Sequence, residues 1–480
     1  MQINPFSSLA ELSQALAQRE YSALELANLY LDRIRIADHA LQAYVSVNEE
    51  SVQLQARASD LRRAAGHSLG VLDGLPIAIK DLCEVQGQVM GCGSLAHKDR
   101  ISTVTATVVE RLRMAGMVVL GKTHMVEFAF GGWGTNPLLG TPRNPWDLST
   151  HRVPGGSSSG SGVAVASGLA PAAIGSDTGG SVRIPSALMG ITGLKTTAGL
   201  ISLHGVAPLS TTLDSIGPMT RTVTDAAMLT QAMAGPDIRD RATLSAPVID
   251  FRAALAGGLD LTGVSIVSLP REQFSGPVEA DVLTAYLRAL DVMRSLGATV
   301  VERSFPFDFA DLMRRNGQVI SAEAWSHLGK MASDGKALLG DAVRARIISG
   351  ASVTVADYIL ALSHRRTACE QWHEWMSGVD AVLTPTLPMV ACSLPDVNEN
   401  ATPLSTFTRA GNYLGSSALT LPAGLSSDGL PIGIQLMGKR FDEARLVRAG
   451  CAFQLATDWH RRIPDLAPLF ERGSDPSPKG

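Results

Sequence analysis

The sequence reads PGGSSSGSG from residue 154 to residue 162 and GSDTGGSVRIP from residue 175 to residue 185. Glycines allow the backbone to approach a bound group closely, and successive N–H groups can form a concave anion-binding site. Acyl transfer needs such a site for the oxyanion of its transition state. A flexible glycine–serine linker would not carry an apolar segment and an Asp-Thr-Gly-Gly-Ser string between its glycines. The two stretches therefore indicate a catalytic centre rather than a linker.

Short apolar runs of strand length lie on both sides of these stretches. They cover residues 76–79, 117–120, 264–267, 381–383 and 432–435. The runs do not alternate between apolar and polar residues, which is typical of strands whose two faces are both covered. A helical pattern from Val278 to Leu296 ends at Gly297, as a helix C-terminus should. We therefore predict an α/β fold in which helices cover a large mixed, mainly parallel twisted sheet.

The N-terminal part of the chain carries two helix-start signals. Ser8 is followed by Glu11 and Ser22 by Glu25, and both pairs fit the capping box that precedes an amphipathic helix. The first 65 or so residues are therefore expected to be helical. The small and apolar stretch 160–174 is too short to span a bilayer, so it is expected to form a helix buried inside the protein.

No internal repeat or low-complexity linker divides the 480 residues. We therefore expect a single catalytic domain over residues 1–472, in which residues 249–401 form a more peripheral part. The last eight residues, GSDPSPKG at 473–480, are expected to be a disordered tail.

The composition is that of an ordinary globular protein, with 45% hydrophobic residues, 18% charged residues and a net charge of −4. No run is rich in lysine and arginine, which argues against nucleic acid or a membrane surface as a partner. The five cysteines are scattered without CxxC pairing and the N-terminus lacks a signal peptide, so we expect a cytoplasmic protein. The histidines show no metal-ligand spacing, so no metal site is expected.

The glycine-rich motifs resemble those of the amidase signature family. Its GGSS-type loop corresponds to residues 155–158, its later Asp-x-Gly-Gly-Ser string to residues 175–185, and its lysine-bearing strand to GLPIAIKD at residues 74–81. The resemblance extends from about residue 5 to residue 460. It implies the layered fold predicted above and an enzyme that hydrolyses amide-type C–N bonds.

The resemblance implies a Ser-Ser-Lys triad. Ser181 would attack the substrate carbonyl, Ser157 would relay its proton, and Lys80 would accept that proton. Because lysine is a base only when neutral, burial would have to lower the pKa of Lys80 from its ordinary value of about 10.4. Asp177 and Arg183 flank the nucleophile and are expected to clamp its loop rather than to take part in the chemistry.

The same resemblance assigns groups that would contact the substrate. The oxyanion hole would consist of the backbone N–H groups of Thr178, Gly179, Gly180 and Ser181. The segment Ala129-Phe130-Gly131 would border the substrate pocket near the nucleophile. Family members hold the relay serine after a cis peptide bond, here Gly156–Ser157, and no cofactor is implied.

The expected substrate is a small amide or a related carbonyl compound such as an aryl amide, a carbamate or an ester, and the enzyme is expected to be a monomer or homodimer. One alternative within the family is the A subunit of glutamyl-tRNA amidotransferase, which hydrolyses glutamine for its partner subunits. That protein usually reads Asn-Met-Asp-Glu-Phe where this chain has HMVEF at residues 124–128. The departure weakens this alternative.

Two further interpretations use the same residues differently. The string GSSSG at residues 156–160 also fits the G-x-S-x-G nucleophile elbow, which would make Ser158 the nucleophile. Pro154 and the lack of an apolar strand before Gly155 count against that interpretation. A non-catalytic scaffold is disfavoured because the lysine and both serines of the family triad are intact.

Overall fold

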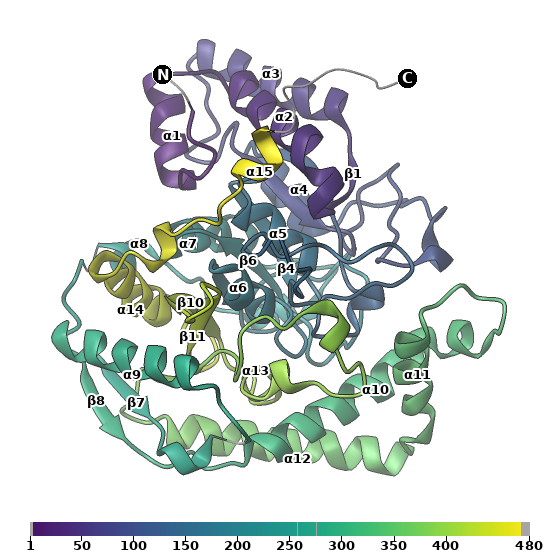
Figure 1. The fold of residues 1–480 in the computed structure, drawn as a ribbon, viewed down its shortest axis with the longest axis vertical. Helices are drawn as coiled ribbons and strands as arrows, with labels where there is room; N and C mark the ends of the chain where they lie inside the picture. The colour runs from purple at the N-terminus through teal and green to yellow at the C-terminus, as the bar shows by residue number, and fades with distance from the viewer. Residues whose placement is uncertain (1–2, 257, 275, 472–480) are drawn as a thin grey trace.

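A computed structural model describes residues 3–256, 258–274 and 276–471 of the chain. These residues form one large sheet surrounded by helices (Figure 1), which confirms the predicted α/β class. The strands are β1 (Tyr44–Val47), β2 (Pro76–Lys80), β3 (Val118–Thr123), β4 (Ala172–Ser176), β5 (Thr192–Lys195), β6 (Ile216–Thr220), β7 (Ser265–Ser268), β8 (Thr299–Glu302), β9 (Ala381–Pro385), β10 (Ala418–Leu425) and β11 (Pro431–Met437). Their order across the sheet is β1-β3-β2-β4-β6-β5-β10-β11-β9-β7-β8.

The sheet is mixed, as predicted, but the expected majority of parallel pairs is wrong. Strand β2 is parallel to β3 and β4, and β7 is parallel to β8 and β9. The other six pairings between described strands are antiparallel. The central strands β10 and β11 form a hairpin closed by the turn 426–430, and such a tight turn can join only antiparallel neighbours.

Fifteen α-helices surround the sheet in the described part of the chain. They are α1 (Leu9–Gln18), α2 (Ala23–Leu41), α3 (Glu49–Ala64), α4 (Thr107–Met114), α5 (Ser159–Ala166), α6 (Arg183–Met189), α7 (Val223–Met233), α8 (Arg252–Leu255), α9 (Ala280–Ser295), α10 (Phe309–Ser333), α11 (Asp341–Ser349), α12 (Val355–Trp375), α13 (Thr408–Tyr413), α14 (Glu443–Ala456) and α15 (Ala467–Phe470). Both predicted capping boxes are formed, at the starts of α1 and α2. Residues 3–65 are mainly helical, as predicted for this part of the chain, and β1 is the strand among them.

The stretch 160–174 does not form the single buried helix that we expected. Helix α5 ends at Ala166, and β4 begins at Ala172. Gly168 has φ +64°, the left-handed conformation that ends many helices, and Pro171 cannot continue one. The stretch is buried as expected, but its last residues belong to a strand between β2 and β6.

One sheet passes through the expected peripheral part of the chain as well as the rest. Strands β7, β8 and β9 belong to residues 249–401 and form one end of the sheet, while α10, α11 and α12 lie together along one side of the molecule (Figure 1). This continuity supports our proposal of a single domain. Arg472 and the predicted tail 473–480 lie outside the described residues.

No single helix among the described residues is long and apolar enough to cross a membrane. In the described part of the chain, one bent pair of segments, Asp341–Ser352 and Val355–Trp375 with a bend of 95° between them, passes that test by length and composition.

Candidate active site

Lys80 is the last residue of β2 and is fully buried. Its Nζ donates hydrogen bonds to Ser157 Oγ at 2.8 Å and to Ser176 Oγ at 2.9 Å. Strands β2 and β4 are parallel neighbours, with Ile79 paired to Ile174, so their carboxyl ends bring Lys80 and Ser176 together. Ser176 belongs to the second glycine-rich stretch, but sequence reasoning assigned it no role.

Burial sets the protonation of Lys80. It lowers the pKa of this amine to about 7, and the neighbouring acidic groups, among them Asp214 and Asp177, reverse only part of this effect. A lysine with this pKa is neutral in a large fraction of the molecules near pH 7. It can therefore act as a base where an exposed lysine could not.

Ser157 follows the cis peptide bond Gly156–Ser157 and lies two residues before α5. Its side chain is fully buried against Lys80. The next residue, Ser158, donates its backbone N–H to the carbonyl oxygen of Ser181 at 3.3 Å, which brings the two serine-bearing segments together. The Ser158 hydroxyl is itself fully buried and accepts the N–H of Ser176 at 3.3 Å, so it is occupied structurally and does not project as a nucleophile elbow requires.

Asp177 holds the loop that carries Ser181. Its carboxylate accepts the N–H groups of Gly180 at 2.8 Å and Val182 at 3.2 Å, and it forms a buried ion pair with Arg183 at 3.0 Å. Burial acts to raise the pKa of Asp177, but Arg183 outweighs it and holds that pKa well below its usual range. The ionised carboxylate therefore fixes the loop at neutral pH.

Three backbone N–H groups of this loop have no protein acceptor. Within the described ranges these are the N–H groups of Thr178, Gly179 and Ser181. Gly180 differs from our prediction because its N–H donates to Asp177. Its φ of +129° and the 2.3 Å from the position of an added Cβ to Thr408 Oγ1 also explain why a glycine is needed there. Thr178 and Ser181 are buried and Gly179 is half-buried. Unpaired buried donors are rare, so these free N–H groups are suited to binding an oxyanion.

A cavity of about 50 Å³ brings the predicted substrate-contacting residues and the predicted nucleophile, Ser181, together. Its lining residues are Ala129, Phe130, Gly131, Gly132, Thr178, Gly179, Ser181, Ile184, Leu209, Ile320, Arg346, Thr402, Ser405 and Arg409. Among the described residues, no protein group forms a hydrogen bond with the Ser181 hydroxyl at this cavity. The two arginines were not predicted, because neither lies in a recognisable motif.

Strained backbone leads into the cavity wall, which begins at Ala129. Phe128 and Ala129 have φ values of +50° and +59°, a conformation that is uncommon for residues other than glycine. Such strain persists only where the surrounding structure enforces it, and it is concentrated at binding and active sites. The carbonyl of the next residue, Phe130, accepts a hydrogen bond from Arg346 at 2.8 Å, which links this segment to α11.

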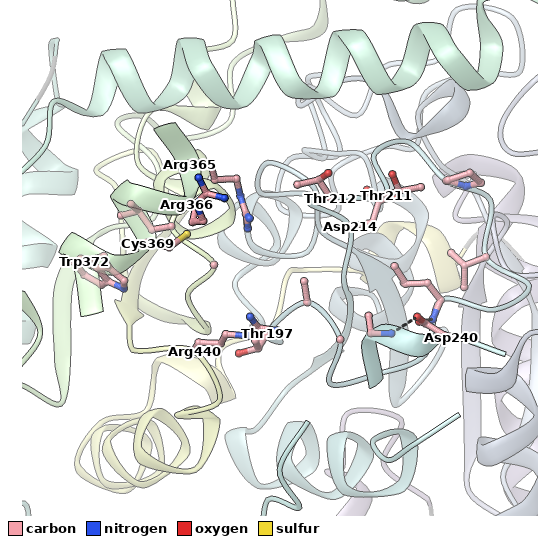
Figure 2. A pocket seen from close by; sticks show the side chains of 18 of the residues that line it. Thr197, Thr211, Thr212, Asp214, Asp240, Arg365, Arg366, Cys369, Trp372 and Arg440 are labelled. Atoms are coloured by element: carbon pink, nitrogen blue, oxygen red, sulfur yellow. Dashed lines mark hydrogen bonds between the residues drawn. The ribbon is translucent and has the colours of Figure 1, made fainter. Parts of the chain in front are cut away.

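A second, larger cavity of about 960 Å³ lies close to the same loop. Figure 2 shows Thr211, Thr212 and Asp214 on one side of it and Arg365 with Cys369 on the other. Asp214 also accepts the hydroxyl of Thr178 at 2.5 Å. The larger cavity thus reaches the wall of the small one, but the predicted triad does not line it.

Comparisons with known proteins extend the similarity from the motifs to the whole chain. The sequence profile of the family described as "Amidase" matches residues 25–447. The A subunit of glutamyl-tRNA(Gln) amidotransferase from Roseiflexus sp. (strain RS-1) is 38% identical over 486 residues, which cover 96% of this chain and 98% of that relative.

Two solved structures share the fold over most of this chain. The native peptide amidase from Stenotrophomonas maltophilia has a TM-score of 0.81 at 30% identity, covering 93% of this chain and 96% of its own. A complex described as revealing the evolutionary origins of an s-triazine catabolic enzyme has a TM-score of 0.86 at 30% identity, covering 93% and 98%. The similarity therefore covers 93% of this chain in both structures.

Proposed function

Because this chain belongs to the amidase family, whose members act on amide C–N bonds, we propose that it hydrolyses such bonds through an acyl-enzyme formed on Ser181. The substrate is a small amide, in which the cleaved bond joins a carbonyl carbon to ammonia or an amine. The observation that carries this proposal is the 2.8 Å contact between Ser157 and a fully buried Lys80 whose pKa is about 7. It couples a base to a hydroxyl relay beside the Ser181 loop.

Each step of the proposed reaction uses a group of this chain. Neutral Lys80 takes the proton of Ser157, Ser157 takes that of Ser181, and Ser181 Oγ forms a bond to the substrate carbonyl carbon. The oxyanion accepts hydrogen bonds from the free N–H groups of Thr178, Gly179 and Ser181. The proton returns to the nitrogen as the C–N bond breaks, and water then cleaves the Ser181 ester by the same relay.

A fluorophosphonate probe tests this proposal without a choice of substrate. The probe should react with Ser181, because this hydroxyl lines the cavity and the loop offers free N–H groups for the phosphoryl oxygen. Peptide mass spectrometry of the treated protein identifies the modified residue. An adduct on Ser158 instead would contradict the triad and support the nucleophile elbow.

The amidotransferase alternative has its own support. Full-length relatives at 38–40% identity are named as the A subunit of glutamyl-tRNA(Gln) amidotransferase, and this favours a glutamine-hydrolysing role with protein partners over the carbamate or ester alternatives. The sequence departure at residues 124–128 is a weak argument against the amidotransferase role, because the departing residues lie outside the cavity wall. Within the described residues neither His124 nor Val126 lines the small cavity, whose wall begins at Ala129.

Ammonia release from glutamine separates the two candidates. A free-standing amidase should hydrolyse a simple primary amide without any partner. If the chain is part of an amidotransferase, it should release ammonia from glutamine, and adding the partner subunits of an amidotransferase relative should raise that rate at least about tenfold. Ammonia is measured with a coupled glutamate dehydrogenase assay. Efficient turnover of simple amides with no response to glutamine or partners would contradict the amidotransferase role.

A further inference from the structure

Arg409 brings a positive charge to the small cavity. It belongs to α13, and the preceding residue, Thr408, donates its hydroxyl to the carbonyl of Gly179 at 2.7 Å, so α13 packs directly on the Ser181 loop. Among the described residues, the guanidinium donates one hydrogen bond, to the carbonyl of Met313 at 3.2 Å, whereas its buried Nε has no partner there. Arg409 forms no ion pair with any residue in the described part of the chain.

Asn316 is a second buried polar group without a partner at the same place. Its side chain is fully buried on α10, and neither its oxygen nor its nitrogen has a hydrogen-bond partner in the part of the chain that the structure describes. A Cβ added to Gly179 would lie 3.4 Å from Asn316 Oδ1 and 3.4 Å from Arg409 Nε. Rotation of the amide by 180° exchanges its oxygen and nitrogen, so Asn316 can present its NH₂ group here. Buried polar groups without partners are expensive, and their presence beside a cavity indicates a ligand that pairs with them.

Among the described residues around the cavity, one cation, Arg409, has no carboxylate paired with it. Arg346, the other arginine of the cavity lining, is paired with Glu399 at 2.5 Å and also donates to the Glu399 carbonyl. Burial lowers the pKa of Arg409 to about 10, and the nearby charge of Arg346 adds to this effect. Arg409 therefore remains protonated at neutral pH, and an anionic group of a ligand would balance its charge.

We infer that Arg409, supported by Asn316, binds a carboxylate carried by the acyl part of the substrate, so that monoamides of short dicarboxylic acids are preferred over neutral amides. The inference rests on the proposed function, since it places the carboxylate in the cavity that Ser181 lines. The cavity of about 50 Å³ accommodates only a short chain. The position of Arg409 beside Gly179 puts that carboxylate a few bonds from the carbonyl that is attacked.

Paired substrates test the inference. Glutaramate and pentanamide have the same number of carbons and the same primary amide, but only glutaramate has a carboxylate. We expect kcat/KM of the wild-type protein to be at least about tenfold higher for glutaramate, because a hydrogen bond to a charged group contributes roughly that much or more. Arg409→Gln should reduce this ratio to near one, and Arg409→Lys should restore part of it.

Arg315→Gln is the matched control. Arg315 precedes Asn316 on the same helix, is paired with Asp311 at 2.6 Å and does not line the cavity, so its replacement should keep the ratio. Asn316→Leu should lower the ratio without lowering the melting temperature, because the leucine removes a buried polar group that has no partner. Equal ratios in wild-type and Arg409→Gln proteins would overturn the inference.

A binding measurement separates this inference from the proposed chemistry. Titration of glutarate into the Ser181→Ala protein by calorimetry needs no turnover. Binding that is lost in the Ser181→Ala, Arg409→Gln double variant supports the carboxylate site even if no amide is hydrolysed. Absence of binding to the Ser181→Ala protein overturns the carboxylate site and leaves the hydrolytic proposal intact, provided that pentanamide is still hydrolysed by the wild-type protein.

Discussion

Replacing Ser181 with alanine should lower kcat for an amide that the wild-type protein hydrolyses by at least about 10⁴-fold, the order of loss seen when a serine hydrolase loses its nucleophile. The variant should fold normally, because the Ser181 hydroxyl forms no hydrogen bond with any described protein group. Residual turnover, if measurable, reflects the free N–H groups alone. Product formation is followed by ammonia release under single-turnover conditions, with circular dichroism as the check on folding.

Ser159→Ala is the matched control for this experiment. Ser159 is a fully buried serine at the start of α5, and its hydroxyl also lacks a hydrogen-bond partner within residues 3–256, 258–274 and 276–471. Its replacement should leave kcat within a few-fold of the wild-type value. Wild-type activity in the Ser181→Ala protein, or loss of activity only in a Ser158→Ala protein, would reject Ser181 as the nucleophile.

Replacing Lys80 with methionine should lower kcat/KM by about 10²–10⁴-fold and abolish its rise with pH, since a positioned base contributes an effect of that size. The pKa of Lys80 is about 7, because burial disfavours the ammonium. Below that pH the lysine is protonated and inactive as a base, so wild-type kcat/KM should increase as pH rises through 7 and then level off. A pH–rate profile from pH 5 to 9 measures both effects.

The free energy of unfolding should also depend on the protonation of Lys80. An unfolded lysine keeps its proton up to its ordinary pKa of about 10.4, whereas folded Lys80 releases its proton near pH 7. Between these values the unfolded state binds more protons, so the Lys80 contribution to the free energy of unfolding increases with pH. The free energy of unfolding of the Lys80→Met protein should rise less steeply with pH, and the rise that remains should include the contribution of Lys195, whose pKa burial also lowers to about 7.

Lys195 provides the control for the pH experiment. Burial also lowers its pKa to about 7, but its Nζ donates to the carbonyl oxygens of Thr196 and Ser416 rather than to a hydroxyl. The Lys195→Met protein should therefore retain the rise of kcat/KM through pH 7. If the rise disappears in that protein and persists in the Lys80→Met protein, Lys80 is not the base.

The features that sequence patterns predict are those with a local physical signal. Five strands are predictable because their buried residues are apolar and do not alternate, as in β2 and β9. Strands β5 and β6 are equally buried but read TGLK and IGPMT, so their glycines and threonines carry no such signal. Their conformation depends on pairing with neighbouring strands, which are distant in the sequence.

The candidate site also combines features that can be predicted from local motifs with features that depend on packing. The triad and the Ser181 loop lie in motifs that can be read directly, whereas the Lys80–Ser176 contact depends on β2 and β4 being neighbours in the sheet. Gly180 is the one loop residue whose N–H the motif assigns wrongly to the oxyanion hole. Its N–H donates to Asp177, and the orientation of that side chain could not be predicted from the sequence. Arg346 and Arg409 reach the cavity only through the packing of α11 and α13, for which no sequence pattern gives a distance.

The cavity of about 50 Å³ is assembled from two separate parts of the chain. The proposed nucleophile, relay and base lie between residues 80 and 181, but Ile320, Arg346, Thr402, Ser405 and Arg409 come from α10, α11, α13 and the segment before it. We therefore expect mutations in this second part to alter which acyl group is accepted without displacing the proposed nucleophile, relay and base. Divergence toward new substrates within such a scaffold would require only a few changes in these helices, and an engineered change of specificity should begin with the same side chains.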